Sequence, residues 1–87
     1  MSRRSSAYDL AQEIIDAASP ISEYYSEVIR DNMEKYGEPE LAAYEAFLDA
    51  KNRNHKMKRA LLEKAEAVWS GIFFPGTTRQ FEPILVD

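Results

Sequence analysis

The longest stretch without a helix breaker runs from Pro39 to Ser70, and it constrains the fold more than any other part of the chain. Pro39 suits the first position of a helix, because its fixed φ is already helical and its missing N–H would have no partner there. The interior is mostly Ala, Leu, Glu, Lys, Arg and Met, which are strong helix formers, and Gly71 fits the position after a helix end. The pattern predicts one helix over residues 39–70, about 48 Å long at 1.5 Å per residue.

Positive charge is concentrated in the middle of this predicted helix. Residues 51–59 hold five basic residues and no acidic one, and we call them the basic band: Lys51, Arg53, Lys56, Lys58 and Arg59. The band is the best candidate for a partner-binding surface, since it suits either an acidic patch on a protein or the phosphates of nucleic acid. The alternatives are a solvated helix surface, or pairing with acidic residues of a second copy.

Two shorter helices are predicted before the long one. Residues 7–18 carry an apolar face, and Ser19-Pro20 ends it because the residue before a proline is disfavoured in the α region. Residues 21–36 also show apolar side chains at helical spacing. Gly37 then permits a short turn, which predicts an antiparallel hairpin between this helix and the long one.

Residues 71–87 predict an extended C-terminal tail that is too apolar for a free linker. It either folds back over the helices or is offered to another chain. The sequence thus predicts one all-α domain over residues 1–87, a helical hairpin or three-helix bundle organised on the long C-terminal helix. A core this thin favours a homo-oligomer, and we expect a dimer formed through the long helix.

Charge and composition limit which partners and which cellular location we expect. The net charge is −4, yet residues 1–50 carry −7 from eleven acidic and four basic residues, which argues against general nucleic-acid coating. Cysteine is absent, and neither a signal peptide nor a run of eighteen apolar residues is present. We expect a cytoplasmic protein without a membrane partner. Residues 1–5 read as a basic terminal segment.

No residue pattern indicates catalysis. His55 is the only histidine, and it lies among lysines and arginines without a carboxylate within one turn. The acidic residues follow the spacing of solvated helix faces, no Glu-x-x-His pair is present, and the three glycines are scattered. We therefore predict no enzymatic activity, no catalytic residue, no metal and no cofactor.

The aromatic residues are possible interface residues. The candidates are Tyr24, Tyr25, Tyr36, Tyr44, Trp69, Phe73, Phe74 and Phe81. Tyrosine is favoured at interfaces because one end is apolar and the other forms hydrogen bonds, although in a small chain it is also typical of the edge of the core.

One resemblance concerns residues 40–69. Glu40-Leu41-Ala42, Asp49, Met57, Arg59 and Val68-Trp69 resemble positions of the small helical haemolysin-expression modulators that bind nucleoid proteins. The N-terminal half does not follow that family, so no functional residue is carried over. The resemblance implies a regulator.

These observations predict a small non-enzymatic protein that binds another protein and modulates or inhibits a larger assembly. As a small, acidic, cysteine-free single domain, it is similar to phage-encoded host-takeover factors. One alternative is a nucleic-acid-associated regulator that acts as a dimer through its basic band. Another is a self-assembling structural protein whose tail docks on a neighbouring subunit.

Overall fold

The computed structural model describes residues 6–87, so the predicted basic segment 1–5 lies outside the described residues. Its helices are α1 (Ser6–Ala18), α2 (Glu23–Glu34), α3 (Pro39–Asn52), α4 (Arg59–Val68) and α5 (Pro75–Thr78), which the 3-10 helix η1 (Arg79–Ile84) continues. Two strands of two residues, β1 (Met57–Lys58) and β2 (Leu85–Val86), pair in parallel. The predicted all-α class is confirmed.

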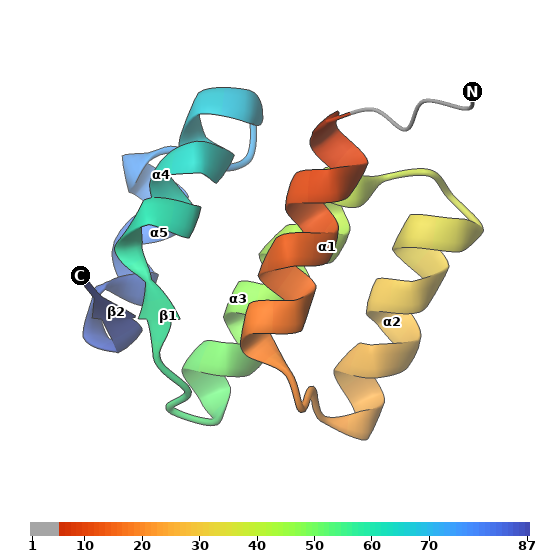
Figure 1. Cartoon of the computed structure of the whole chain (residues 1–87), viewed down its shortest axis with the longest axis horizontal. Helices are drawn as coiled ribbons and strands as arrows, with labels where there is room; N and C mark the ends of the chain where they lie inside the picture. Colours follow the sequence, from red (N-terminus) through yellow and green to blue (C-terminus); the bar gives the residue numbers. More distant parts are fainter. Residues whose placement is uncertain (1–5) are drawn as a thin grey trace.

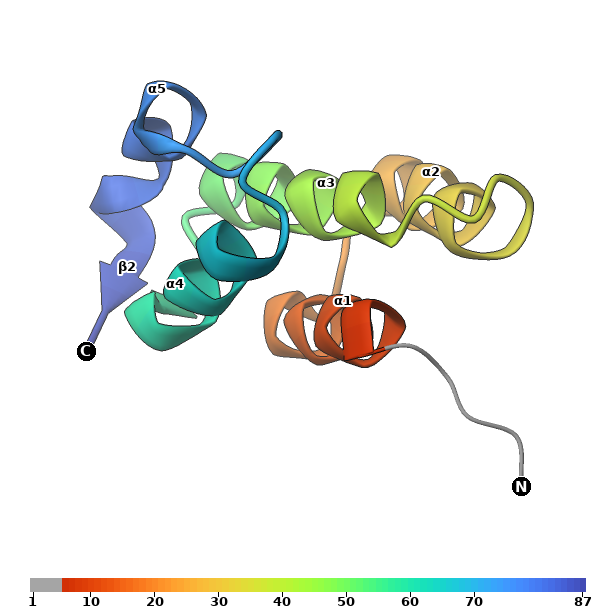
Figure 2. The same cartoon turned by 90° about the horizontal axis from the view of Figure 1, so that it is seen from above.

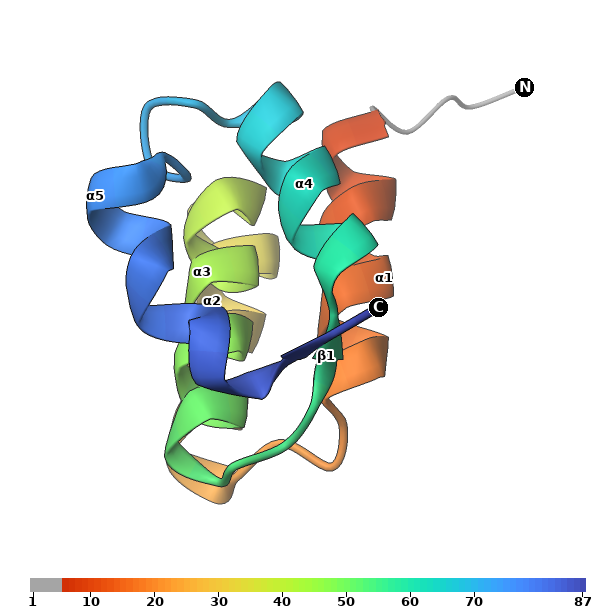
Figure 3. The same ribbon diagram turned by 90° about the vertical axis from the view of Figure 1, so that its left-hand side faces the viewer.

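The centre of the molecule is α3, against which α1, α2 and η1 pack (Figure 1). Seen from above, α2 and α3 lie in one layer and α1 lies in a second layer beneath them (Figure 2). Figure 3 shows α5 and η1 along one side of α3 and α4 along the other. Four alanines of α3 are completely buried, and their small side chains let neighbouring helices approach closely: Ala42, Ala43, Ala46 and Ala50.

The prediction of one unbroken helix over residues 39–70 is wrong, because the chain leaves the helix at Asn54. This residue has φ +56°, in the left-handed region that asparagine tolerates better than most residues. The amide of Asn54 donates to the Lys51 carbonyl at 3.1 Å, and the amide of His55 donates to the Ala50 carbonyl at 2.8 Å. This pair of hydrogen bonds is a Schellman motif, which ends α3 although the surrounding residues are strong helix formers.

We predict that Asn54→Ala lowers the free energy of unfolding by about 1 kcal/mol, since alanine pays the full steric cost of a positive φ. Asn54→Gly should leave the stability unchanged or raise it slightly, because glycine adopts this conformation freely. Urea denaturation followed by circular dichroism would measure both. An alanine variant as stable as the wild type would contradict the assigned helix end.

The other two helix connections agree with the sequence. The break at Ser19-Pro20 is confirmed, and its peptide bond is cis. Gly37 has φ +62°, and a Cβ at this position would lie 3.1 Å from the Tyr8 hydroxyl. The antiparallel packing of α2 on α3 is confirmed, with Ile29 as the buried residue of α2.

The prediction of an extended tail is wrong, whereas the alternative that residues 71–87 fold back over the core is confirmed. Phe73, Phe81 and Ile84 are buried. The Phe47 ring centroid lies 5.9 Å from that of Phe73 and 5.2 Å from that of Phe81. Burial of these apolar side chains fixes the tail on its own chain, so it forms short helical elements in place of an extended segment.

Candidate protein-binding site

The basic band does not form one continuous surface. Lys51 lies in the last turn of α3, Lys58 in β1 and Arg59 at the start of α4. Because the chain turns at Asn54, the single basic helix on which the predicted surface depended does not exist. The members of the band therefore lie in different elements and have different contacts.

Arg53 belongs to a buried polar cluster that joins three helices. Asp49, at 1% exposure, accepts hydrogen bonds from Arg53 Nε at 2.7 Å and from the Ser22 hydroxyl at 2.6 Å. Arg53 Nη2 also donates to the Ala18 carbonyl. The cluster thus connects the ends of α1 and α3 to the residue that precedes α2. Arg53 is occupied inside the fold.

His55 supports the same junction. One of its ring nitrogens, Nε2, lies 2.8 Å from the Ala17 carbonyl oxygen. A carbonyl only accepts hydrogen bonds, so Nε2 carries the proton and donates it. This contact gives His55 a structural role between α1 and the turn after α3.

Arg59 holds the C-terminal segment. Its two terminal nitrogens pair with the Glu82 carboxylate at 2.9 and 3.2 Å, and its Nε donates to Asp87 Oδ1 at 3.2 Å. The hydrogen bond and charge of Arg59 lower the pKa of Glu82, and the hydrogen bond and charge of Glu82 raise the pKa of Arg59. Both side chains are exposed to solvent, so this ion pair acts mainly by orienting residues 82–87.

Two lysines of the band also contact the C-terminal segment. Lys56 Nζ donates to the Pro83 carbonyl at 3.2 Å, and Lys51 Nζ donates to Gln80 Oε1 at 3.3 Å. Both lysines are exposed, and these neutral acceptors leave their charge uncompensated. Lys51 and Lys56 therefore remain able to attract an acidic partner.

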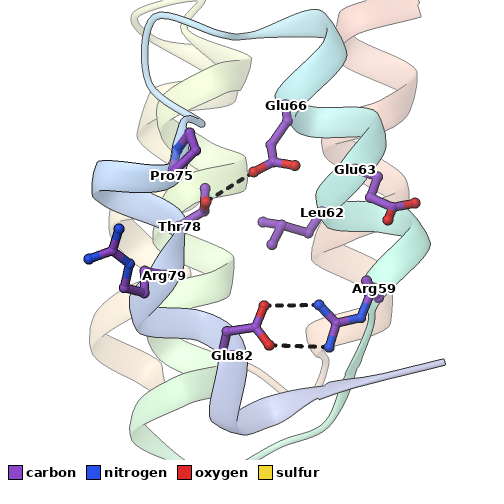
Figure 4. Close-up of a pocket in the computed structure, with 8 residues that line it drawn as sticks. All are labelled: Arg59, Leu62, Glu63, Glu66, Pro75, Thr78, Arg79 and Glu82. Atoms are coloured by element: carbon purple, nitrogen blue, oxygen red, sulfur yellow. Dashed lines mark hydrogen bonds and ion pairs between the residues drawn. The ribbon is translucent and has the colours of Figure 1, made fainter.

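A hollow of about 370 Å³ lies between α4 and the α5–η1 segment (Figure 4). Its walls include Glu63, Glu66 and Arg79 beside the Arg59–Glu82 pair, and Thr78 Oγ1 donates to Glu66 at 3.0 Å. Among residues 6–87, no group of three His, Cys, Asp or Glu side chains could hold a metal ion. Charges of both signs line this hollow, so it favours neither an anion nor a cation.

A different surface combines lysines with an apolar floor. A hollow of about 530 Å³ lies between α1 and the β1–α4 segment, and a second of about 340 Å³ extends it along α1 and α4. Glu13 and Lys64 line both, so we treat them as one feature, the α1–α4 groove. Figure 1 shows α1 and α4 beside each other, running in opposite directions. The lining residues are Ser6, Asp9, Leu10, Glu13, Ala17, Lys56, Met57, Lys58, Ala60, Leu61, Lys64, Ala67 and Val68.

The charges of this groove are available to a partner. Lys58 and Lys64 are exposed, and their ammonium groups form no hydrogen bond or ion pair within residues 6–87. Buried Met57 and Leu61 contribute to the floor, and Val68 is 49% exposed at one end. The groove therefore offers positive charge beside accessible apolar surface.

Sequence reasoning found Lys56 and Lys58 but missed Lys64 and the α1 wall of the groove. Lys64 lies five residues beyond the band, next to acidic Glu63. A usable signal was the helical spacing of Ala60, Lys64 and Ala67, which places small and basic side chains on one face.

The eight predicted interface aromatics divide into two groups. The exposed ones are Tyr24 at 73%, Tyr36 at 61% and Phe74 at 42%. The others contribute to the core or bond within the chain: Tyr25, Tyr44, Trp69, Phe73 and Phe81. The expectation of an interface role is wrong for Phe73 and Phe81, because both are buried in the chain's own core.

Comparisons of the chain with known protein families, curated proteins and solved structures find no match. The resemblance to the haemolysin-expression modulators thus gains no support from a matching family. Within residues 6–87, no helix combines the length and apolar character needed to cross a membrane.

Proposed function

We propose that this protein is a small non-enzymatic module that binds another protein through the α1–α4 groove. One observation carries the proposal: Lys58 and Lys64 form no hydrogen bond or ion pair with another side chain of residues 6–87, and they stand beside an apolar floor. An acidic surface with some apolar character is the complementary partner. By covering that surface, the module would modulate or inhibit the larger assembly that carries it.

The two parts of the groove contribute differently to binding. Exposed ion pairs are worth about 0.2–1 kcal/mol each, so the lysines mainly accelerate and orient the encounter. Burial of apolar area contributes about 25 cal/mol per Å² of apolar surface. Because Met57 and Leu61 are already buried, most of the affinity comes from the exposed apolar side chains of the groove, which are Ala17, Ala60, Ala67 and Val68. The association rate should therefore fall with salt more steeply than the dissociation rate rises.

The alternatives have less support from the geometry. A nucleic-acid-binding dimer depended on one long basic helix, yet Arg53 and Arg59 pair with carboxylates of their own chain. A dimer through the long helix depended on an open helix face, yet α1, α2 and η1 cover α3. Self-assembly through the tail required residues 77–87 to be available, yet Phe81 and Ile84 are buried.

We predict that Lys58→Glu/Lys64→Glu reduces capture of the partner at least about fivefold, as expected for two reversed ion pairs. The assay is affinity capture from a lysate of the source organism or its host, with nuclease present, at low and moderate salt, read by mass spectrometry. The matched control is Lys35→Glu/Arg79→Glu, which changes the net charge equally at exposed positions outside the groove.

The control variant should capture the partner as the wild type does. Equal capture by the wild type and the groove variant, with the same dependence on salt, would contradict the proposed site. Return of the bait alone would favour self-assembly.

A further inference from the structure

We infer that the occupant of the α1–α4 groove is an acidic amphipathic helix of the partner, with its C-terminal end toward Lys56 and Lys58. This inference rests on the proposed function and names the class of ligand and its direction. It follows from the shape of the groove, from the charge across it and from the charge along it.

The shape of the groove favours a helix. Both long walls are helices running side by side in opposite directions, and the channel between two such ridges is straight. The exposed wall residues Ala17, Ala60 and Ala67 are small, so a third helix can approach closely. A peptide that binds by strand addition would instead need a long free strand edge, whereas β1 has two residues and already pairs with β2.

The length of the groove limits the occupant. With α1 of 13 residues and α4 of 10 residues as its walls, the groove can contact about 15–20 Å of a helix, or about 10–13 residues at 1.5 Å each. Three turns present one apolar stripe of about four side chains to the floor. A short helical segment of a larger protein is therefore sufficient.

The charge differs across the groove. The α4 wall carries Lys58 at its base and Lys64 midway, whereas Glu13 lies on the α1 wall. No ion pair joins Glu13 to Lys64 within residues 6–87, so both charges can act on an occupant. The occupant should place its acidic side chains on the flank that faces α4.

The charge also differs along the groove. Lys56 and Lys58 lie at the end formed by Ala17, whereas Ser6, Ala67 and Val68 lie at the opposite end, where no lysine lines the groove among residues 6–87. A helix carries partial negative charge at its C-terminus and partial positive charge at its N-terminus. The favoured occupant therefore runs parallel to α1 and antiparallel to α4, with its last carbonyl groups near the two lysines.

The test is an NMR titration of the full chain with three designed peptides of about fourteen residues, slightly longer than the groove. The first has leucines at helical spacing and glutamates along one flank, with acetylated and amidated ends. The second replaces every glutamate with glutamine, and the third keeps the glutamates but has two central prolines. The first should shift amide signals of α1, β1 and α4, and the other two should bind at least about tenfold more weakly.

The variants from the capture experiment separate specific from general charge effects. Lys58→Glu/Lys64→Glu should lower the affinity for the first peptide at least about fivefold. Lys35→Glu/Arg79→Glu should keep that affinity within about twofold of the wild-type value. A spin label at the peptide C-terminus should broaden the amide signals near Lys58 more than those near Asp9. Broadening in the opposite order would overturn the inferred direction.

Two outcomes separate this inference from the proposed function. If the proline peptide binds as tightly as the helical one, the helical occupant is wrong, while acidic recognition by the groove stands. If no acidic peptide shifts α1 or α4, yet partner capture still depends on Lys58 and Lys64, the inferred ligand class is overturned and the site is retained. Capture that is independent of both lysines overturns the proposed function itself.

Discussion

Asp49→Ala is expected to lower the free energy of unfolding by about 3 kcal/mol, because it leaves a partly buried guanidinium without its carboxylate. Asp49 is 1% exposed and accepts bonds from Arg53 and Ser22, so all of these contacts disappear together. A chain of 87 residues has a total stability of about 4–13 kcal/mol, so the loss is a large fraction of it. Urea denaturation followed by circular dichroism would measure it.

Glu45→Gln is the matched control, one turn earlier on α3. Glu45 is half-buried, and burial raises the pKa of its carboxyl, so the charge of this side chain gains no stabilisation from the fold. The control should therefore change the stability by less than about 0.5 kcal/mol. A similar loss in both variants would mean that any removal of charge from α3 is costly, and would contradict the special role of the Asp49 cluster.

The predicted helices were right where a local signal decided the structure and wrong where local signals competed. The proline of Ser19-Pro20 restricts the backbone before it, and Gly37 adopts a positive φ without steric cost, so both breaks occur as predicted. Asn54 stands among strong helix formers, so the sum of helix propensities outweighed one residue that tolerates a positive φ. The turn at Asn54 allows α4 to pack against α1 and η1 to pack against α3, and these contacts lie far apart in the sequence.

In the candidate site, too, contacts between residues close in the sequence could be predicted, and contacts between distant residues could not. The Arg53–Asp49 pair has a spacing of four residues, so it is visible in the sequence as a helical ion pair. The partners of Arg59 lie 23 and 28 residues away, and no periodic pattern relates them. The α1–α4 groove likewise depends on two helices separated by more than forty residues, so only the tertiary arrangement brings Glu13 beside Lys64.

Phe81→Ala is expected to destabilise the protein by about 3–5 kcal/mol, the usual loss for a buried phenylalanine. Its ring is completely buried, with its centroid 5.2 Å from that of Phe47 and 5.5 Å from that of Tyr44. The substitution would leave a cavity between η1 and α3. The C-terminal segment should therefore open at a lower urea concentration than α1, α2 and α3. Hydrogen exchange of the Val86 amide, compared with that of Ile29 in α2, would show the local opening.

Phe74→Ala provides the control, because Phe74 lies in the same segment but is 42% exposed. Its substitution should lower the free energy of unfolding by less than about 1 kcal/mol. The pair of variants also tests where the tail belongs. If residues 71–87 dock on their own chain, Phe81→Ala changes stability and exchange without any dependence on protein concentration. A stability that rises with protein concentration, in the wild type as in the variant, would instead show that the tail docks on a second copy, because unfolding would then include dissociation.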